Sequence, residues 1–230
     1  MYNYKEYCPI SKTASIVCER WTVQIVREMF MGCSRFSEFQ KYLPRLSPSL
    51  LNARLRALET AGVIMRKRIA GQRGYEYLLT SSGKALGPMI TEMGKWGMRW
   101  ARDEMTDEEL NAEIVLRDVT STVDTSELPA GITFIEFEFS DIAGRAKWYV
   151  KIEDGTIEIC DENPGHEPDV YFVTTLKRLV EVWMDVVGLQ DARNNGSLKI
   201  TASPTYLKNL SRWFQTSSFL PKQESAVPET

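Results

Sequence analysis

The chain has 230 residues, of which 43% are hydrophobic, with 28 basic and 31 acidic side chains and a net charge of −3. This is enough material for two buried cores of about 100 residues each. No apolar run approaches the roughly 20 residues of a membrane-spanning helix, and the start lacks a secretory signal pattern. The chain has four cysteines, none in a C-x-x-C pair, and a single histidine, which are too few ligands for a zinc finger. The cysteine spacing shows no disulfide framework. We therefore expect a reduced, cytoplasmic protein without a metal or a membrane partner.

The charged residues are distributed unevenly along the chain. Residues 1–102 contain 17 basic and 7 acidic residues, a net charge of +10, whereas residues 103–230 contain 11 and 24, a net charge of −13. Such asymmetry predicts two domains with different partners. The basic half suits a polyanion, because neutralising phosphates releases counterions and favours binding to any sequence. The acidic half is expected to face away from DNA.

The first forty residues are expected to form three helices. Apolar residues recur at helical spacing over 10–17 and over 20–30, where Gly32 supplies a stop. A third helix begins at 34–39 and ends near Pro44, since the residue before a proline disfavours helix. We interpret the third helix as the positioning helix of a helix-turn-helix, which crosses the groove ahead of the recognition helix.

Residues 47–59 have the pattern of a recognition helix. Ser47 is a good N-cap, and Pro48 fits the first helical position. Leu51, Leu55 and Leu58 fall on one buried stripe. The other face carries short polar and guanidinium side chains, which suit base edges and phosphates in a major groove. The candidate DNA-contacting residues here are Ser47, Ser49, Asn52, Ala53, Arg54 and Arg56.

Two β-rich runs, 63–69 and 75–79, flank the basic turn Gly71-Gln72-Arg73-Gly74. This pattern predicts a hairpin with a positive tip, and a helix followed by such a hairpin is typical of a winged helix-turn-helix. The alternative is an ordinary solvated basic helix and hairpin, which the charge distribution disfavours. Further candidate DNA contacts are Arg35, Arg66, Arg68, Gln72 and Arg73.

A long last helix, capped by residues 80–83, is expected to close the basic half. One side of it carries Leu86, Ile90, Met93, Trp96, Gly97 and Trp100. We interpret this apolar side, aided by the N-terminal segment, as a homodimer element, because two-fold symmetry matches paired DNA half-sites. The alternative is that the stripe packs on its own domain or on the second one.

The acidic half follows a different pattern. Residues 103–119, with a Thr106–Glu109 capping box, are expected to form an acidic linker helix. Over 120–220, strands are expected at 133–139, 147–152, 156–160, 169–173 and 198–200, with helices at 176–187 and 204–214. An antiparallel sheet covered by helices is an α+β layer. Residues 221–230 are expected to be a flexible tail, so domain 1 is 1–102 and domain 2 is 120–220.

The sequence shows no catalytic constellation. His166 lies in a proline- and acid-rich loop, where we interpret it as a surface residue, and one histidine leaves no Ser-His-Asp arrangement to assemble. A phosphate-binding glycine loop is also missing. We expect a protein that is not an enzyme and needs no cofactor.

Several short motifs follow one another in the first half of the chain: Cys8-Pro9, Glu19-Arg20-Trp21-Thr22, residues 32–39, Leu46-Ser47-Pro48, residues 55–59, residues 75–80 and Gly94-Lys95-Trp96-Gly97. In this order they resemble the HxlR-type transcriptional regulators over about the first hundred residues. The resemblance implies a dimeric winged-helix DNA-binding protein of bacterial type. Two features depart from the pattern: Glu19-Arg20 replaces the usual Gly-Lys, and the wing turn lacks the usual Pro-Pro. The second departure concerns how the wing contacts DNA.

In some members of that family, a cysteine near the N-terminus senses oxidants or electrophiles, and Cys8 occupies the matching position. Sensing requires a thiolate, which exposure, nearby cations or a helix N-terminus favour. Cys8 precedes a helix start and has Lys5 and Lys12 nearby in sequence. The alternative is a small buried hydrophobe that titrates normally.

A second set of features lies in the acidic half: the order and spacing of residues 169–200, the Pro164-Gly165 loop, Trp183 and Trp213. With these, roughly residues 110–220 resemble the sterol carrier protein family, in its C-terminal half and in a version fused behind HxlR-type domains. This resemblance implies a sheet-and-helix fold that opens an apolar groove for a lipid-like or aromatic ligand. Aromatic residues of this kind also belong in cores. The ligand-pocket candidates are Phe137, Trp148, Trp183, Trp213 and Phe214.

Three hypotheses for function follow. The first is a DNA-binding transcriptional regulator, a dimeric repressor, whose second domain binds a small apolar effector that favours one dimer arrangement. The second is a regulator that responds to oxidation of Cys8, with the second domain as a scaffold. The third is a lipid-binding carrier module with a vestigial helix-turn-helix, against which the charge of +10 argues.

Overall fold

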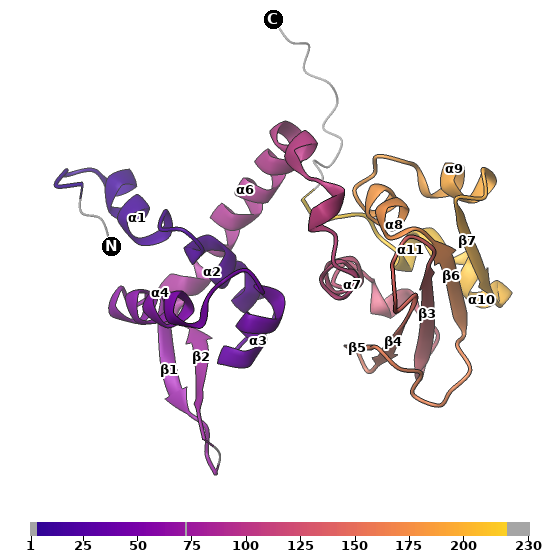
Figure 1. Ribbon diagram of the computed structural model, residues 1–230, viewed down its shortest axis with the longest axis horizontal. Coiled ribbons are helices and arrows are strands. Elements are labelled where there is room, and N and C mark those ends of the chain that lie inside the picture. The colour runs from indigo at the N-terminus through magenta and orange to yellow at the C-terminus, as the bar shows by residue number, and fades with distance from the viewer. Residues whose placement is uncertain (1–3, 72, 220–230) are drawn as a thin grey trace, which may run out of the picture. The chain divides into compact units, whose positions relative to one another are not determined.

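The computed structural model describes residues 4–71 and 73–219. The chain divides into two compact units, Met1–Trp96 and Gly97–Thr230, each described here by itself (Figure 1). The first unit contains α1 (Pro9–Val17), α2 (Thr22–Phe30), α3 (Phe36–Tyr42), α4 (Pro48–Thr60), β1 (Ile64–Arg68), β2 (Tyr75–Leu79), α5 (Ser81–Lys84) and most of α6 (Gly87–Trp100). Among the described residues, no helix combines the length and the apolar composition needed to cross a membrane.

The core of the first unit joins α2, α3 and α4. Leu51, Leu55 and Leu58 of α4 are at most 1% exposed, which confirms the predicted stripe, and they share a cluster with Ile25 and Phe39. Burying such aliphatic side chains stabilises a fold by roughly 1.5–3 kcal/mol each. The position of α4 is therefore set by its inner face, which leaves its outer face available.

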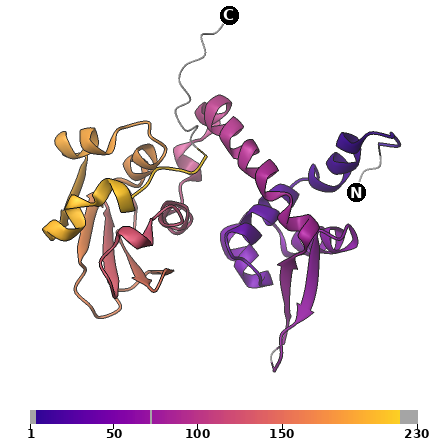
Figure 2. The same ribbon diagram turned by 180° about the vertical axis from the view of Figure 1, so that it is seen from behind.

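The hairpin of β1 and β2 extends away from these helices, as both views show (Figures 1 and 2). Its antiparallel register pairs Arg68 with Tyr75 at the outer end. Gly71 and Gly74 have φ angles of 70° and 118°, a left-handed conformation that glycine adopts without strain. In the middle of β2, the backbone N–H of Tyr77 donates to the carbonyl oxygen of Ser34 (2.8 Å), which ties the hairpin to the segment before α3.

The predicted long helix from Thr80 is wrong in one respect, because the chain forms α5 and then α6. The Thr80 hydroxyl accepts from the N–H of Gly83 (3.2 Å) and caps only the short α5. Pro88, in the first turn of α6, has no N–H to continue an earlier helix, and its ring disfavours helical geometry at the residue before it. Similarly, α2 begins at Thr22 rather than Arg20, since Trp21 has a left-handed φ of 74°.

The second unit contains the 3-10 turns η1 (Arg102–Glu104), η2 (Asp107–Glu109) and η3 (Thr125–Glu127), the helices α7 (Ala112–Thr120), α8 (Leu176–Trp183), α9 (Leu189–Asn194), α10 (Pro204–Lys208) and α11 (Leu210–Trp213), and the strands β3 (Thr133–Phe139), β4 (Lys147–Glu153), β5 (Thr156–Cys160), β6 (Val170–Thr174) and β7 (Leu198–Ala202). The strands lie in the order β5-β4-β3-β6-β7. Pairing is antiparallel except between β3 and β6, which are parallel. The purely antiparallel sheet that we expected is therefore wrong: the sheet is mixed.

The predicted linker helix over 103–119 is also different in the structure. The Thr106–Glu109 capping box is confirmed, with the N–H of Thr106 donating to Glu109 Oε2 (3.0 Å), but it opens only the short turn η2. The later part belongs to α7, where Leu116 and Val119 are at most 1% exposed within the second unit's core. An apolar face of this kind must be covered, so α7 is part of the fold rather than a linker.

Two helices of the second unit are shorter than predicted. The helix expected over 176–187 ends at Trp183, and Asp185 then adopts a left-handed φ of 52°. The helix expected over 204–214 is interrupted at Asn209, which separates α10 from α11. The expected tail at 221–230 lies outside the described residues.

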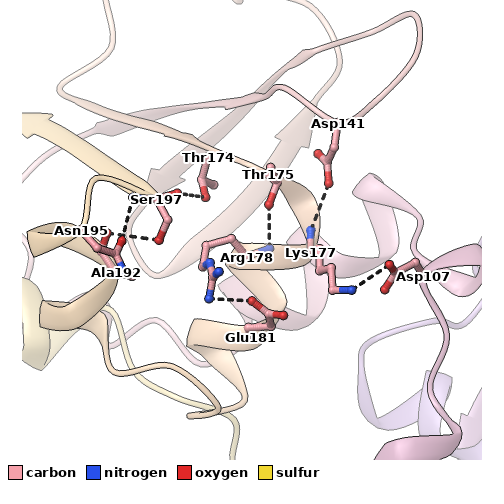
Figure 3. A network of polar contacts seen from close by, with 10 residues as sticks. All are labelled: Asp107, Asp141, Thr174, Thr175, Lys177, Arg178, Glu181, Ala192, Asn195 and Ser197. Atoms are coloured by element: carbon pink, nitrogen blue, oxygen red, sulfur yellow. Dashed lines mark hydrogen bonds and ion pairs between the residues drawn. The ribbon is translucent and has the colours of Figure 1, made fainter.

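The start of α8 is held by side chains from other parts of the second unit (Figure 3). The carboxylate of Asp141 accepts from the backbone N–H groups of Leu176 (2.7 Å) and Lys177 (3.4 Å). The Thr175 hydroxyl caps the N–H of Arg178 (3.0 Å). A negative side chain is favourable there, because the N–H groups of the first turn have no partner within the helix.

Candidate functional site

The outer face of α4 presents a row of accessible polar side chains. Ser47, Ser49, Asn52, Ala53 and Arg56 are all exposed. The Ser47 hydroxyl accepts from the N–H of Leu50 (3.4 Å), as expected of an N-cap, and the Asn52 Nδ2 donates to the carbonyl oxygen of Pro48 (3.1 Å). The Asn52 amide keeps its oxygen and one N–H for an outside partner. This face therefore offers donors and acceptors along one helix.

Arg54 differs from these neighbours, because its guanidinium is engaged within the protein. Its Nε donates to the carbonyl oxygen of Arg20 (2.8 Å), and its Nη2 lies 3.0 Å from Oε2 of Glu19. Its side chain is only 18% exposed. Arg54 thus connects α4 to the turn before α2 and is better placed to orient the helix than to contact a base. The one sequence signal for this role is the place of Arg54 at the edge of the exposed face of the helix, next to the leucine stripe.

The hairpin adds basic side chains at a second surface. Arg66 lies 3.4 Å from Glu59 Oε1, and its guanidinium stacks 4.5 Å from the ring centroid of Tyr75. Arg68 and Arg73 are exposed near the tip and line an open hollow there with Ile69, Ala70 and Gly71. Arg35 is exposed directly before α3, and its backbone forms an isolated antiparallel β-bridge with the backbone of Glu76. Gln72 lies outside the described residues.

Helix α6 exposes a large apolar stripe. Met93, Trp96 and Trp100 are 49%, 63% and 62% exposed, and in α1 Ile10 is 78% exposed. Residues three and four positions apart lie on the same face of a helix. An exposed stripe of this size marks an interaction site.

Cys8 is the N-cap residue of α1 and is half-buried. The pKa of its thiol lies below its usual value, chiefly because the backbone N–H of Ser11 donates to the sulfur, with a further contribution from the N–H of Ile10. The Ser11 hydroxyl contributes in the same direction and also lies 2.5 Å from Glu6 Oε2. A helix N-terminus favours a thiolate in the same way.

The ligand-pocket candidates of the second unit lie in or against its core. Phe137, Trp213 and Phe214 are at most 5% exposed, and each packs on other aromatic rings. Phe172, which the sequence did not single out, stacks on Phe137 (4.7 Å between centroids) and contacts Trp213 and Phe214 (6.2 and 5.3 Å). Trp148 packs against the same cluster. These rings fill the space between the sheet and α11, so they form a closed aromatic core in this structure.

The helix of exposed donors, held by a buried stripe and followed by a basic hairpin, defines the first unit as a winged helix-turn-helix DNA-binding domain. Residues 16–105 match the model of the HxlR-like helix-turn-helix family. The chain belongs to this family of transcriptional regulators, because it spans 99% of the uncharacterized HTH-type transcriptional regulator YvaP of Bacillus subtilis with 39% identity.

Other similar proteins have the same character. The uncharacterized HTH-type transcriptional regulator sll1512 of Synechocystis is 34% identical over 98 residues, which are 42% of this chain and 73% of that protein. The YvaP match covers 46% of this chain. Among solved structures, the reduced form of the transcriptional regulator YodB from B. subtilis is 28% identical, covers 43% of this chain and 98% of its own, and has a TM-score of 0.38.

Proposed function

We propose that this transcriptional regulator binds operator DNA as a homodimer, with α4 in the major groove and the hairpin of β1 and β2 against the backbone. The observation that carries the proposal is the exposed row on α4, next to a hairpin that presents Arg68 and Arg73. Side chains on a recognition helix read base edges, whereas basic residues on a wing neutralise phosphates without reading sequence.

The test separates reading of bases from general affinity. An operator is selected from random duplexes with the wild-type protein, and its dissociation constant is measured for Arg56→Ala and for the control Lys208→Ala, an exposed cation of the second unit. Loss of a base contact costs about 1–3 kcal/mol. We expect Arg56→Ala to weaken binding accordingly and to relax preference at one base pair, and Lys208→Ala to bind normally. Unchanged affinity and preference of Arg56→Ala would contradict the assignment of α4.

We infer the dimer from the apolar stripe of α6. Met93, Trp96 and Trp100 expose about half or more of their surface. Transferring such surface out of water on association is favourable at about 25 cal/mol per Å². A two-fold dimer would place two copies of α4 at paired half-sites, as is usual for helix-turn-helix proteins.

We further propose that the second unit binds a small apolar effector, as its resemblance to the sterol carrier protein family implies. Its support is an aromatic core that includes Phe137, Phe172 and Trp213. Since these rings pack on one another, ligand entry requires them to separate. Native mass spectrometry of the purified protein tests this: an added mass of a few hundred daltons that disappears on denaturation supports an occupied site. A ligand regulates only if it prefers one dimer arrangement.

A second mode of regulation is favoured by the lowered pKa of Cys8, which increases its thiolate fraction near neutral pH. We propose that Cys8 oxidation changes DNA binding. Cys8→Ser is expected to bind operator like the reduced wild type and to lose any response to an oxidant such as diamide. A mutant that still responds would assign the response to another group.

A further inference from the structure

The tryptophan indole N–H groups in the second unit's core differ in whether they have a hydrogen-bond acceptor. Trp183 Nε1 donates to Thr122 Oγ1 (3.0 Å), and Trp213 Nε1 donates to the carbonyl oxygen of Tyr206 (3.0 Å). Trp148 Nε1 is buried, yet no acceptor among the described residues lies within hydrogen-bonding distance. A buried donor without an acceptor is unfavourable and rare in folded proteins. Trp148 is therefore the place where the core offers a hydrogen bond to a molecule other than the chain itself.

Trp148 lies where an apolar ring would find a surface to stack on. It stands directly opposite Phe137 in the register of β3 and β4, on the face that carries the aromatic core. The guanidinium of Arg145 lies over its ring, 5.8 Å from the centroid. An apolar surface with one buried donor and one nearby cation has the composition of a small-molecule site.

Arg145, which lies over the Trp148 ring, is itself paired with Asp161 directly after β5. The two side chains are 48% and 57% exposed. Exposed ion pairs are weak, so an incoming anionic group could replace Asp161 as the partner of Arg145 at little cost.

The segment that carries Arg145 is fixed at one end and free to turn at the other. Asp141 is held by the N–H groups at the start of α8 (Figure 3). Gly144, directly before Arg145, has a φ of 95° and open space around the position of a side chain. Glycine rotates easily between backbone conformations. Gly144 can therefore act as a pivot that moves Arg145 away from Trp148 while Asp141 stays in place.

We propose that the effector of the second unit is an apolar, ring-containing molecule with a carboxylate or carbonyl oxygen, which accepts a hydrogen bond from Trp148 Nε1 after Arg145 separates from Asp161. This inference rests on the proposed effector function and adds the chemistry of the ligand. Phe137 and Trp148 pack on its apolar frame. Because Arg145 is positively charged, a ligand with a carboxylate should bind more tightly than one with a neutral carbonyl.

The experiment compares three probes that share one apolar frame: 2-naphthoate, 2-acetylnaphthalene and naphthalene. They are titrated into the full chain labelled with ¹⁵N-tryptophan, in which the Trp148 indole signal is assigned from Trp148→Phe. We expect both oxygen-bearing probes to move that indole proton downfield and to bind about tenfold more tightly than naphthalene, the effect of about one hydrogen bond. Trp148→Phe should bind 2-acetylnaphthalene and naphthalene alike, with 2-naphthoate keeping only the advantage that Arg145 gives it, and Arg145→Ala should weaken 2-naphthoate without affecting 2-acetylnaphthalene.

Two outcomes would overturn the inference in distinguishable ways. If naphthalene binds as tightly as the other probes, or if the advantage of 2-acetylnaphthalene over naphthalene survives in Trp148→Phe, the second unit has an effector site but Trp148 does not anchor the ligand. If none of the probes binds, the effector proposal fails as well, while operator binding by the same sample remains intact. If Trp148→Phe folds poorly, Asp161→Asn replaces it as the test variant. Removing the partner of Arg145 is expected to increase the association rate of 2-naphthoate. An unchanged association rate would contradict the proposed separation of Arg145 from Asp161.

Discussion

Arg54 Nη2 lies 3.0 Å from Glu19 Oε2, and this ion pair joins the recognition helix to the turn before α2. The same guanidinium donates through Nε to the carbonyl oxygen of Arg20. The orientation of α4 is thus fixed by the protein before any DNA is bound. It follows that one arginine of α4 sets geometry, whereas Arg56, which is exposed, remains available to a ligand.

Arg54→Ala is therefore expected to affect stability before it affects recognition. Hydrogen bonds from a charged group contribute about 1.5–3 kcal/mol, and this one is partly screened, so we expect a loss of about 1–2 kcal/mol. The measurement is amide hydrogen exchange over α4 and the start of α2, which reports local opening. Arg56→Ala serves as the control and should leave exchange unchanged. Equal exchange in Arg54→Ala and wild type would show that the contact contributes nothing.

Arg73→Ala tests the wing separately from α4. Because a phosphate contact carries no sequence information, the variant should weaken binding to all duplexes by a similar factor. The slope of log affinity against log salt should fall by about one. Titrations of the selected operator and of an unrelated duplex at several salt concentrations provide both numbers. A loss confined to the operator would mean that Arg73 reads bases.

Gly83→Ala is expected to destabilise the first unit. A Cβ at this position would lie 2.2 Å from the carbonyl oxygen of Val63 and 2.9 Å from Leu79 Cδ2. Neither the hairpin backbone nor α5 can move apart freely, and overpacking of this kind costs about 1–3 kcal/mol. Thermal unfolding followed by circular dichroism measures the shift, with the exposed neighbour Ser82→Ala as a control that should change little. A Gly83→Ala protein that melts like Ser82→Ala would contradict the close approach.

Trp96→Asp is expected to dissociate the proposed dimer. It places a charge on the stripe of α6, where Trp96 is 63% exposed, and burying an unpaired charge is strongly unfavourable. Sedimentation velocity across a concentration series should show a shift to monomer, together with weaker operator binding. Lys95→Ala, on the same helix but away from the stripe and 40% exposed, is the matched control. A Trp96→Asp protein that sediments as a dimer would place the interface elsewhere.

The thiol of Cys8 is expected to react at lower pH than an ordinary thiol. Because hydrogen bonds from Ser11 and Ile10 lower the pKa of Cys8 below its usual value, the thiolate, which is the reactive form, is populated from a lower pH upward. Rates of iodoacetamide modification of the Cys8 peptide, measured by mass spectrometry between pH 6 and 10, give the midpoint. Free N-acetylcysteine is the reference, and a midpoint at or above its value would refute the prediction.

Local patterns predicted the first unit well. The N-cap at Ser47, the proline after it and the leucine stripe of α4 are all short-range signals, and the structure has the helix at Pro48–Thr60. The hairpin followed from two β-rich runs around glycines, and β1 and β2 pair there. The prediction of one continuous helix after Thr80 was wrong, because the chain forms α5 and α6 with Pro88 near the break. A stripe of apolar residues does not reveal such an interruption.

The second unit depended on contacts between distant residues. Strand positions were readable from alternation, but the parallel pairing of β3 with β6 joins strands that are far apart in the chain, which periodicity does not encode. The aromatic side chains were recognised, whereas their packing on Phe172 and the unpaired donor of Trp148 were not. Hydrogen-bond satisfaction is a property of three-dimensional neighbours, so no sequence pattern announces it.

The parallel pairing of β3 with β6 has a consequence for the order in which the protein forms. The central strand pair of the second unit cannot close until β4 and β5 have been made and β6 has followed them. Closing a longer loop costs more entropy, and such non-local pairing slows folding. The first unit depends mainly on helices and one local hairpin, and domains near the N-terminus fold first during synthesis. We therefore expect a nascent chain to fold its winged helix-turn-helix while the sheet that follows is still incomplete.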